Sequence, residues 1–261
     1  MPMILNHCHV MPEGTFKKDD PLEGSIARLK VWMQELGFEK AVAFAPFASQ
    51  MKSDPNEWLL AALAGKKDIY GYATINPAEP GAAERLRHFV ARGLAGAKIH
   101  PPIFRIQIND PAIDPFFRVA EELGIPVQFH TGVHGWFIQK YQPILLDDLA
   151  QRHPKLPIII GHVGGAAFFD QALAVLQNNR NTYAEVAQTR REEVAWHLSP
   201  ERIKALLRYV GPSRMIYGAD YPYNDVAILR DDLAWIRGWG LSREDEAKIL
   251  GGNLARLLQR R

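Results

Sequence analysis

The chain has 261 residues, of which 47% are hydrophobic and 23% are charged, and its formal net charge is +2. This length fits a single α/β domain spanning residues 1–261, with enough apolar residues for a substantial core. The nearly balanced charge lacks the excess of positive charge that is typical of proteins that bind nucleic acid or an anionic membrane, so we expect neither as a partner.

Short apolar runs rich in β-branched residues alternate along the chain with longer segments of helical period. The expected strands are 4–10, 40–46, 70–76, 97–100, 126–131, 157–163, 182–187 and 215–220. Because helical pattern follows each of them, we expect parallel strands joined by right-handed crossovers. The sequence therefore predicts a (β/α)8 TIM barrel, with a doubly wound open sheet as the alternative.

Helix signals lie between the expected strands. Apolar residues that recur at helical intervals predict an amphipathic helix after the first strand. They are Ile26, Leu29, Trp32, Met33 and Leu36. Ser199 followed by Pro200 is the pattern of an N-cap and a first helical residue, which predicts a further helix after the seventh strand.

The first expected strand ends in His7-Cys8-His9. The alternation of side chains along a strand sends the two histidines to one side and Cys8 to the other. Two imidazoles at the mouth of a barrel can bind one divalent ion, although an HxH motif alone is a weak signal. Cys8 should face the helical layer as a small buried hydrophobe.

Three more residues with ligand chemistry lie at the ends of later expected strands, namely His130, His162 and Asp220. The carboxyl ends of the strands form the catalytic face of a (β/α)8 barrel. Each residue alone has an ordinary explanation as a core histidine or a helix cap. Together with His7 and His9, they form a constellation that predicts a metal site.

These motifs resemble the amidohydrolase superfamily, in the branch of metal-dependent TIM-barrel hydrolases that also includes decarboxylases of the aminocarboxymuconate-semialdehyde type. The resemblance covers essentially the whole chain. It rests on HCH (7–9), GAKIHP (96–101), GIPVQFHTG (124–132), HP (153–154), GHVGG (161–165), GADYP (218–222) and KILGGNLARLL (248–258). Asn6 and Ala219 replace the usual Asp and Ser of the family, and neither is a ligand position.

The resemblance implies a role for each candidate ligand. His7, His9 and His130 would bind the metal through imidazole nitrogens. Asp220 would be a ligand that also takes a proton from the metal-activated water. His162 would either bind a second metal or polarise the substrate carbonyl. We expect one ion rather than two, with Zn²⁺ as the first choice and Mn²⁺ as the alternative.

Lys98 and His100 lie on the same side of the fourth expected strand. Several two-metal members of the superfamily carry a CO2-modified lysine on this strand. The resemblance therefore implies, as one interpretation, that Lys98 carries a carbamate. The alternative is a lysine that pairs with a buried charge, of which Glu185 is one candidate, or that binds substrate. His100 is either a substrate contact or a packed histidine.

Loop residues at the same face complete the expected substrate-binding set. They are His134, Trp136, Arg190 and Tyr223. An arginine could hold a substrate carboxylate through two parallel hydrogen bonds, whereas a solvated arginine is the ordinary alternative.

The predicted activity is hydrolysis of a C–N or C–O bond in a small-molecule amide, lactone or ester. Metal-activated water would attack, with Asp220 as general base and then acid, and His162 would stabilise the oxyanion. The alternative is non-oxidative decarboxylation of a small unsaturated or aromatic carboxylic acid. The sequence is also compatible with assembly of the chain into a homo-oligomer.

Cys8 is the single cysteine, which excludes an intrachain disulfide. The N-terminal segment MPMILNHCHV has no basic stretch followed by a long apolar run, so we expect no secretory signal. No segment approaches the ~20 apolar residues of a membrane span. The expected location is the cytoplasm.

Overall fold

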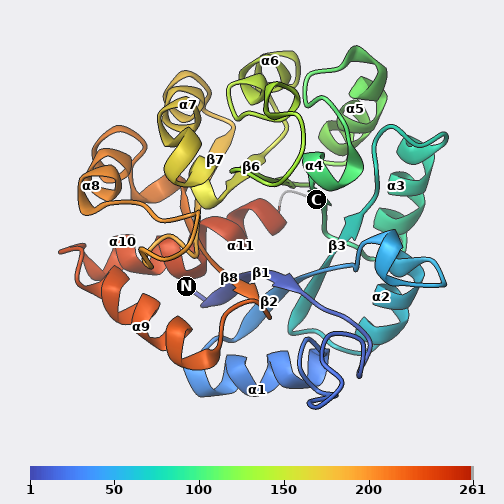
Figure 1. Ribbon diagram of the computed structural model, residues 1–261, viewed down its shortest axis with the longest axis horizontal. Helices are drawn as coiled ribbons and strands as arrows, with labels where there is room; N and C mark the ends of the chain where they lie inside the picture. The colour runs from blue at the N-terminus through green and yellow to red at the C-terminus, as the bar shows by residue number, and fades with distance from the viewer. Residues whose placement is uncertain (260–261) are drawn as a thin grey trace.

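In the computed structural model, which describes residues 1–259, eight parallel strands close into a barrel in sequence order (Figure 1). The strands are β1 Ile4–His9, β2 Lys40–Phe44, β3 Ile69–Thr74, β4 Gly96–Ile99, β5 Val127–His130, β6 Ile158–Gly161, β7 Thr182–Ala187 and β8 Met215–Tyr221. β1 pairs with both β2 and β8, which closes the sheet. The predicted TIM barrel is confirmed, and the open sheet is excluded because it would leave two edge strands unpaired.

The observed strands differ from the expected ones by at most two residues at either end. Two of the differences have a clear cause. Pro126 and Pro157 have no N–H to donate to the ladder, so β5 and β6 begin one residue later. At the other end of β6 the chain turns away from the sheet at His162, which ends the strand early.

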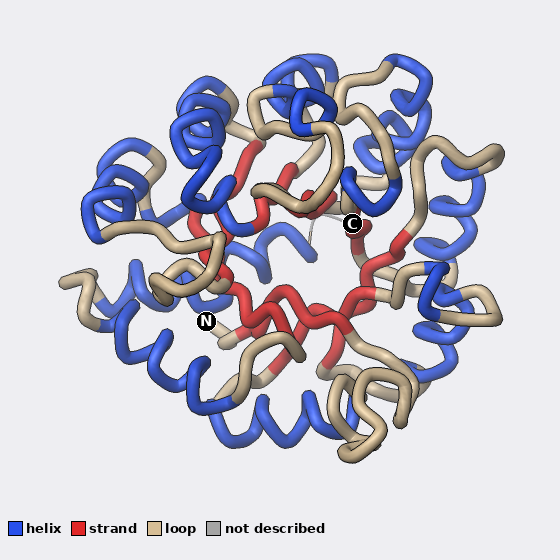
Figure 2. Tube along the Cα trace, in the orientation of Figure 1, coloured by secondary structure: helices blue, strands red, loops and turns tan. Residues whose placement is uncertain are grey.

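Helices form an outer ring around the strands (Figures 1 and 2). The helices are α1 Ile26–Leu36, α2 Pro55–Leu63, α3 Ala82–Ala91, α4 Pro101–Phe104, α5 Asp114–Glu122, α6 Leu145–Arg152, α7 Gly165–Asn178, α8 Pro200–Tyr209, α9 Val226–Arg237, α10 Arg243–Ala247 and α11 Asn253–Leu258, of which α11 lies inside the ring. The apolar face predicted for α1 is the face that it buries, and Ser199 caps α8 as expected. No helix within residues 1–259 is both long and apolar enough to cross a membrane.

Side chains alternate between the two sides of the barrel wall. On β2, Ala41 and Ala43 belong to the apolar layer under the helices, whereas Val42 and Phe44 belong to a separate cluster inside the barrel. Three leucines of α11 complete the inner cluster. They are Leu254, Leu257 and Leu258.

The helix α11 closes the barrel at the end where the strands begin. The π-helical turn Lys248–Gly252 leads into α11, and its Gly251 lies against the backbone of Pro2 and Ile4 at the start of β1. Figure 1 shows α11 inside the outer ring of helices. With this end filled by leucines, polar side chains inside the barrel collect at the other end, where the strands finish.

Replacing Leu254 with alanine tests this closure. Leu254 is 1% exposed, so the change should leave a cavity and lower the free energy of unfolding by about 2–5 kcal/mol. Leu22→Ala is the matched control, because Leu22 is 41% exposed and its loss should cost less than about 0.5 kcal/mol. Urea denaturation measures both. Equal effects of the two substitutions would contradict the packing of α11 in the barrel.

Candidate metal centre

A β-bulge in β1 turns Asn6 and His7 toward the inside of the barrel. The register with β2 and β8 shifts between Leu5 and Cys8, and His7 adopts a left-handed φ of 61°. Leu5 and Cys8 both pack in the layer under the helices. Strict alternation from Leu5 would have sent His7 outward with it, so the bulge's extra residue puts both histidines of the HxH motif on the inner side.

Left-handed backbone is concentrated at the ends of the strands around this site. His7, His162, Gln188 and Asp220 have φ values of 61°, 58°, 55° and 52°. Non-glycine residues rarely adopt this region, and they persist there only where the surrounding structure holds them. Each of the four directs its side chain into one polar cluster, so the unusual backbone serves the site.

Imidazoles from two strand ends meet the carboxylate of Asp220. His7 Nε2 lies 3.3 Å from Asp220 Oδ1, and His9 Nε2 lies 3.6 Å from the same oxygen. One ligand atom each of His7, His162 and Asp220 lies within 4.8 Å of the other two. The ring of His130 lies farther round the cavity, with its centroid 5.0 Å from that of His162. All five expected ligands therefore lie at one end of the barrel, with His130 beside the main group.

Hydrogen bonds at the other ring nitrogens orient two of these imidazoles. His7 Nδ1 lies 2.8 Å from Glu185 Oε2, and His162 Nδ1 lies 3.0 Å from the carbonyl oxygen of Ala187. Both partners only accept, so each Nδ1–H donates and each Nε2 keeps its lone pair for another ligand. His130 Nε2 is buried with no hydrogen-bond partner within residues 1–259. Imidazole nitrogens and a carboxylate oxygen suit Zn²⁺ or Mn²⁺, and these residues fit such an ion.

Burial keeps the imidazoles of this group neutral. It lowers the pKa of His7, His9 and His130 well below the usual value, and that of His162 to about 4. A histidine must be neutral to bind a metal. Burial also raises the pKa of Asp220 to about 7, an effect that the nearby positive charge of Lys98 opposes.

Lys98 is fully buried behind the cavity, where its Nζ lies 3.2 Å from His7 Nε2. Burial lowers its pKa to about 8, against the attraction of the Glu185 and Asp220 carboxylates. The expected ion pair between Lys98 and Glu185 is not formed among the described residues. The carboxylate of Glu185 binds His7 instead.

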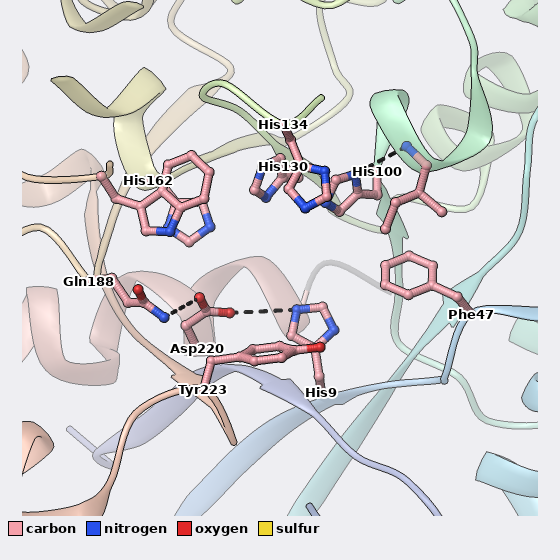
Figure 3. Close-up of a pocket in the computed structure, with 11 residues that line it drawn as sticks. His9, Phe47, His100, His130, His134, His162, Gln188, Asp220 and Tyr223 are labelled. Carbon is pink, nitrogen blue, oxygen red and sulfur yellow. Dashed lines mark hydrogen bonds and ion pairs between the residues drawn. The ribbon is translucent and has the colours of Figure 1, made fainter. Parts of the chain in front are cut away.

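A cavity of about 300 Å³ opens at this group (Figure 3). It is lined by His9, Phe47, His100, Ile103, His130, His134, His162, Gln188, Trp196, Asp220 and Tyr223. His100, His134 and Tyr223, which were expected to contact substrate, are among these lining residues. Within residues 1–259, no lysine or arginine lines this cavity.

The other three residues expected to touch substrate do not line the cavity, which corrects their predicted position. Lys98 lies behind His7. The ring of Trp136 stacks on Tyr141, with centroids 6.2 Å apart and an interplanar angle of 19°. Arg190 Nε donates to Asp232 at 2.7 Å. A place in a loop after a strand does not set the direction of a side chain, because Trp136 and Arg190 each turn toward their own partner.

Four residues that line the cavity were not predicted, namely Phe47, Ile103, Gln188 and Trp196. Gln188 Nε2 donates to Asp220 Oδ2 at 2.6 Å, and Figure 3 shows the carboxylate between Gln188 and His9. Gln188 directly follows an expected strand, so its place at a strand end was a usable signal. Trp196 lies nearly parallel to His162, with ring centroids 4.7 Å apart, and only a glycine at 132 leaves room for its indole. Nothing in the sequence around Trp196 indicated this contact.

A sequence model of the protein family described as Amidohydrolase matches residues 7–260 of this chain. No curated protein matches the sequence. An uncharacterized TIM-barrel protein from Bordetella bronchiseptica is similar in structure, with a TM-score of 0.82 and 18% identity over 100% of this chain and 99% of that one.

Two further solved structures are similar to this chain. One is a dihydroxybenzoic acid decarboxylase from Polaromonas sp. JS666 with bound manganese and the inhibitor 2-nitroresorcinol, with a TM-score of 0.74 and 17% identity over 98% of this chain and 96% of that one. The other is a probable 2-pyrone-4,6-dicarboxylic acid hydrolase from Acinetobacter baumannii with citric acid bound, with a TM-score of 0.72 and 17% identity over 99% of each chain. At these identities the likeness shows a shared fold.

The reactivity of Cys8 reports which way β1 faces. The thiol is fully buried under the helices, and burial raises its pKa well above the usual value, so it stays protonated at neutral pH. We expect no reaction with Ellman's reagent in the native protein and one reactive thiol per chain in guanidinium chloride. Rapid labelling of the native protein would mean that Cys8 faces the cavity, and the proposed orientation of His7 and His9 would then be wrong.

Proposed function

The chain belongs to the amidohydrolase family of metal-dependent enzymes, and we propose that it hydrolyses a C–N or C–O bond in a small-molecule amide, lactone or ester. The observation that carries this proposal is the place of Asp220. Its carboxylate lies within 3.6 Å of the Nε2 atoms of His7 and His9, at the wall of a cavity large enough for a small substrate.

His7, His9, His130, His162 and Asp220 are the proposed ligands of one divalent ion, Zn²⁺ or Mn²⁺. A bound ion of this kind supplies a water of lowered pKa and a Lewis acid for the substrate carbonyl. The manganese in the similar decarboxylase structure supports the choice of a divalent first-row metal.

The remaining chemistry is assigned to side chains. Asp220 would take the proton of the attacking water and return it to the leaving group. Gln188 binds Asp220 Oδ2 and leaves Oδ1 directed toward the imidazoles. His162 donates its Nδ1–H to Ala187, so its neutral ring has no second proton to offer an oxyanion. This favours His162 as a ligand over a role in polarising the carbonyl.

The walls of the cavity favour a second candidate, the decarboxylation of an aromatic carboxylic acid. The rings of His100 and His130 stack with centroids 3.9 Å apart and an interplanar angle of 9°, and Phe47 and Trp196 add aromatic surface. Flat walls of this kind suit a planar ring. Since no lysine or arginine lines this cavity within residues 1–259, a substrate carboxylate would have to bind at the ion.

An isotope experiment separates the two reactions. The Mn²⁺-loaded and the Zn²⁺-loaded protein are incubated in ¹⁸O-labelled water with a panel of lactones, esters and amides and with a panel of aromatic carboxylic acids. Hydrolysis places one labelled oxygen in the product acid. Decarboxylation releases CO2 and leaves no solvent oxygen in the product. The absence of turnover on both panels would count against both candidates.

Asp220→Asn should lower kcat on any substrate found by at least about 100-fold, because the amide cannot accept the proton. Metal content of the purified variant, measured by mass spectrometry, should stay close to one ion per chain if the imidazoles retain it. Asp231→Asn is the matched control, since Asp231 is 68% exposed in its side chain and lies outside the cavity. Near-normal turnover in Asp220→Asn would remove Asp220 from the mechanism.

Lys98→Met distinguishes the roles left open for Lys98. If Lys98 is a buried cation 3.2 Å from a ligand nitrogen, its removal should raise the affinity for Mn²⁺ by about tenfold or more, because like charges repel strongly in the interior. Isothermal titration of the metal-free protein measures this, with the exposed Lys30→Met as control. Loss of bound metal would instead indicate a carbamate ligand at Lys98.

A further inference from the structure

Glu185 lies in a closed hydrogen-bonded cage beneath His7, and no step of the proposed reaction uses it. The side chains of Glu185, His7, Asn6 and Gln128 are all fully buried. Glu185 Oε1 accepts from Asn6 Nδ2 and from Gln128 Nε2, each at 2.8 Å. Glu185 Oε2 accepts from His7 Nδ1, also at 2.8 Å. The cage thus joins β1, β5 and β7 across the inside of the barrel.

We propose that Glu185 is a positioning residue that fixes the tautomer and the direction of His7 for metal binding. This inference rests on the proposed metal-dependent function. A carboxylate can only accept, so its contact with His7 requires a proton on Nδ1. The lone pair is then on Nε2, which faces Asp220 at 3.3 Å. A carboxylate behind a ligand imidazole also raises the basicity of its metal-binding nitrogen.

The surroundings of Glu185 are arranged for a single carboxylate. Asn6 supplies donors toward both Glu185 and Gln128, at 2.8 and 2.9 Å. An aspartate at position 6 would bring a second carboxylate to the same distance, and two such groups cannot both be ionised. A Cβ at Gly218 would clash with Glu185 Oε1, and one at Gly161 would lie 3.2 Å from Oε2. Glycine at these positions leaves space for the acid.

A glutamine at position 185 would disturb this arrangement. Its amide NH2 would meet the NH2 groups of Asn6 and Gln128, which already point at the same place. Donors facing donors leave buried groups unsatisfied. Moving the acid to position 6 removes the conflict once the Gln128 amide turns over, so that its NH2 donates to the carboxylate at position 6 and its carbonyl oxygen accepts from the amide at position 185. In the double variant Asn6→Asp/Glu185→Gln, the amide introduced at position 185 can donate to the carboxylate introduced at position 6, while its carbonyl oxygen accepts from His7 Nδ1.

The test compares wild type, Glu185→Gln, Asn6→Asp and the double variant, with the exposed Glu35→Gln as a matched control. Mn²⁺ affinity and stoichiometry are measured by isothermal titration of the metal-free proteins. We expect one ion per chain in wild type and a loss of affinity of about 10–100-fold in Glu185→Gln. The double variant should recover most of that loss, and Glu35→Gln should bind as wild type does.

A second readout does not depend on affinity. The ¹⁵N shifts of His7 in metal-free wild type should show a protonated Nδ1 and an unprotonated Nε2, and this single tautomer should be lost in Glu185→Gln. A merely structural role would lower the unfolding midpoint of Glu185→Gln but leave its Mn²⁺ affinity unchanged. That result, or the opposite tautomer in wild type, would overturn the inference.

The two experiments also separate this inference from the proposed function. Failure of wild type to bind Mn²⁺ or Zn²⁺ would count against the metal-dependent function, while the ¹⁵N shifts would still decide whether Glu185 orients His7. If Glu185→Gln does not fold, the wild-type shifts and the affinity of the double variant decide the question alone.

Discussion

The pairing of β1 with β8 is the contact on which the candidate site depends. It places Asn6 opposite Gly218 and Cys8 opposite Tyr221, so the two ends of the chain meet in one sheet. In that register His7 Nε2 reaches Asp220 Oδ1 at 3.3 Å. Closure also leaves no strand edge to be covered, and all eight strands finish at the same end of the barrel. Ligands from distant segments can converge there because they share one rim.

The site departs from regular strand geometry wherever a side chain must be turned toward it. The bulge in β1 and the left-handed φ values of His7, His162 and Asp220 occur at the ends of strands whose other residues alternate regularly. Such backbone costs on the order of 1–3 kcal/mol per residue. The two apolar layers, one under the helices and one closed by α11, hold the strand ends in place and offset this cost.

Few charged side chains lie inside the barrel, and each of them has a hydrogen-bonding partner. The imidazoles are neutral because burial opposes their protonation, and the carboxylate of Glu185 is bound by three donors. Lys98 is the nearby cation, and it lies behind His7 rather than in the cavity. A dication would therefore meet neutral nitrogens and a carboxylate at the cavity, on a surface with little fixed charge of its own.

Local sequence patterns were sufficient to predict the barrel and to place the candidate ligands at one end of it. Strand limits fell within two residues of the observed ones, because runs of apolar residues mark the segments that the barrel wall buries. The places of His130, His162 and Asp220 followed from the rule that barrel strands present their last residues to one face. These inferences need only the order of residues along each strand and the choice of fold.

Those patterns could not predict contacts between segments that are distant in the sequence. The bulge that turns His7 inward, the partner of Glu185, and the choice of Trp196 over Trp136 as a cavity wall all depend on the register of neighbouring strands and on the path of loops. Periodicity describes a strand in isolation, whereas these contacts exist only after the sheet has closed and each loop has packed against what lies beside it.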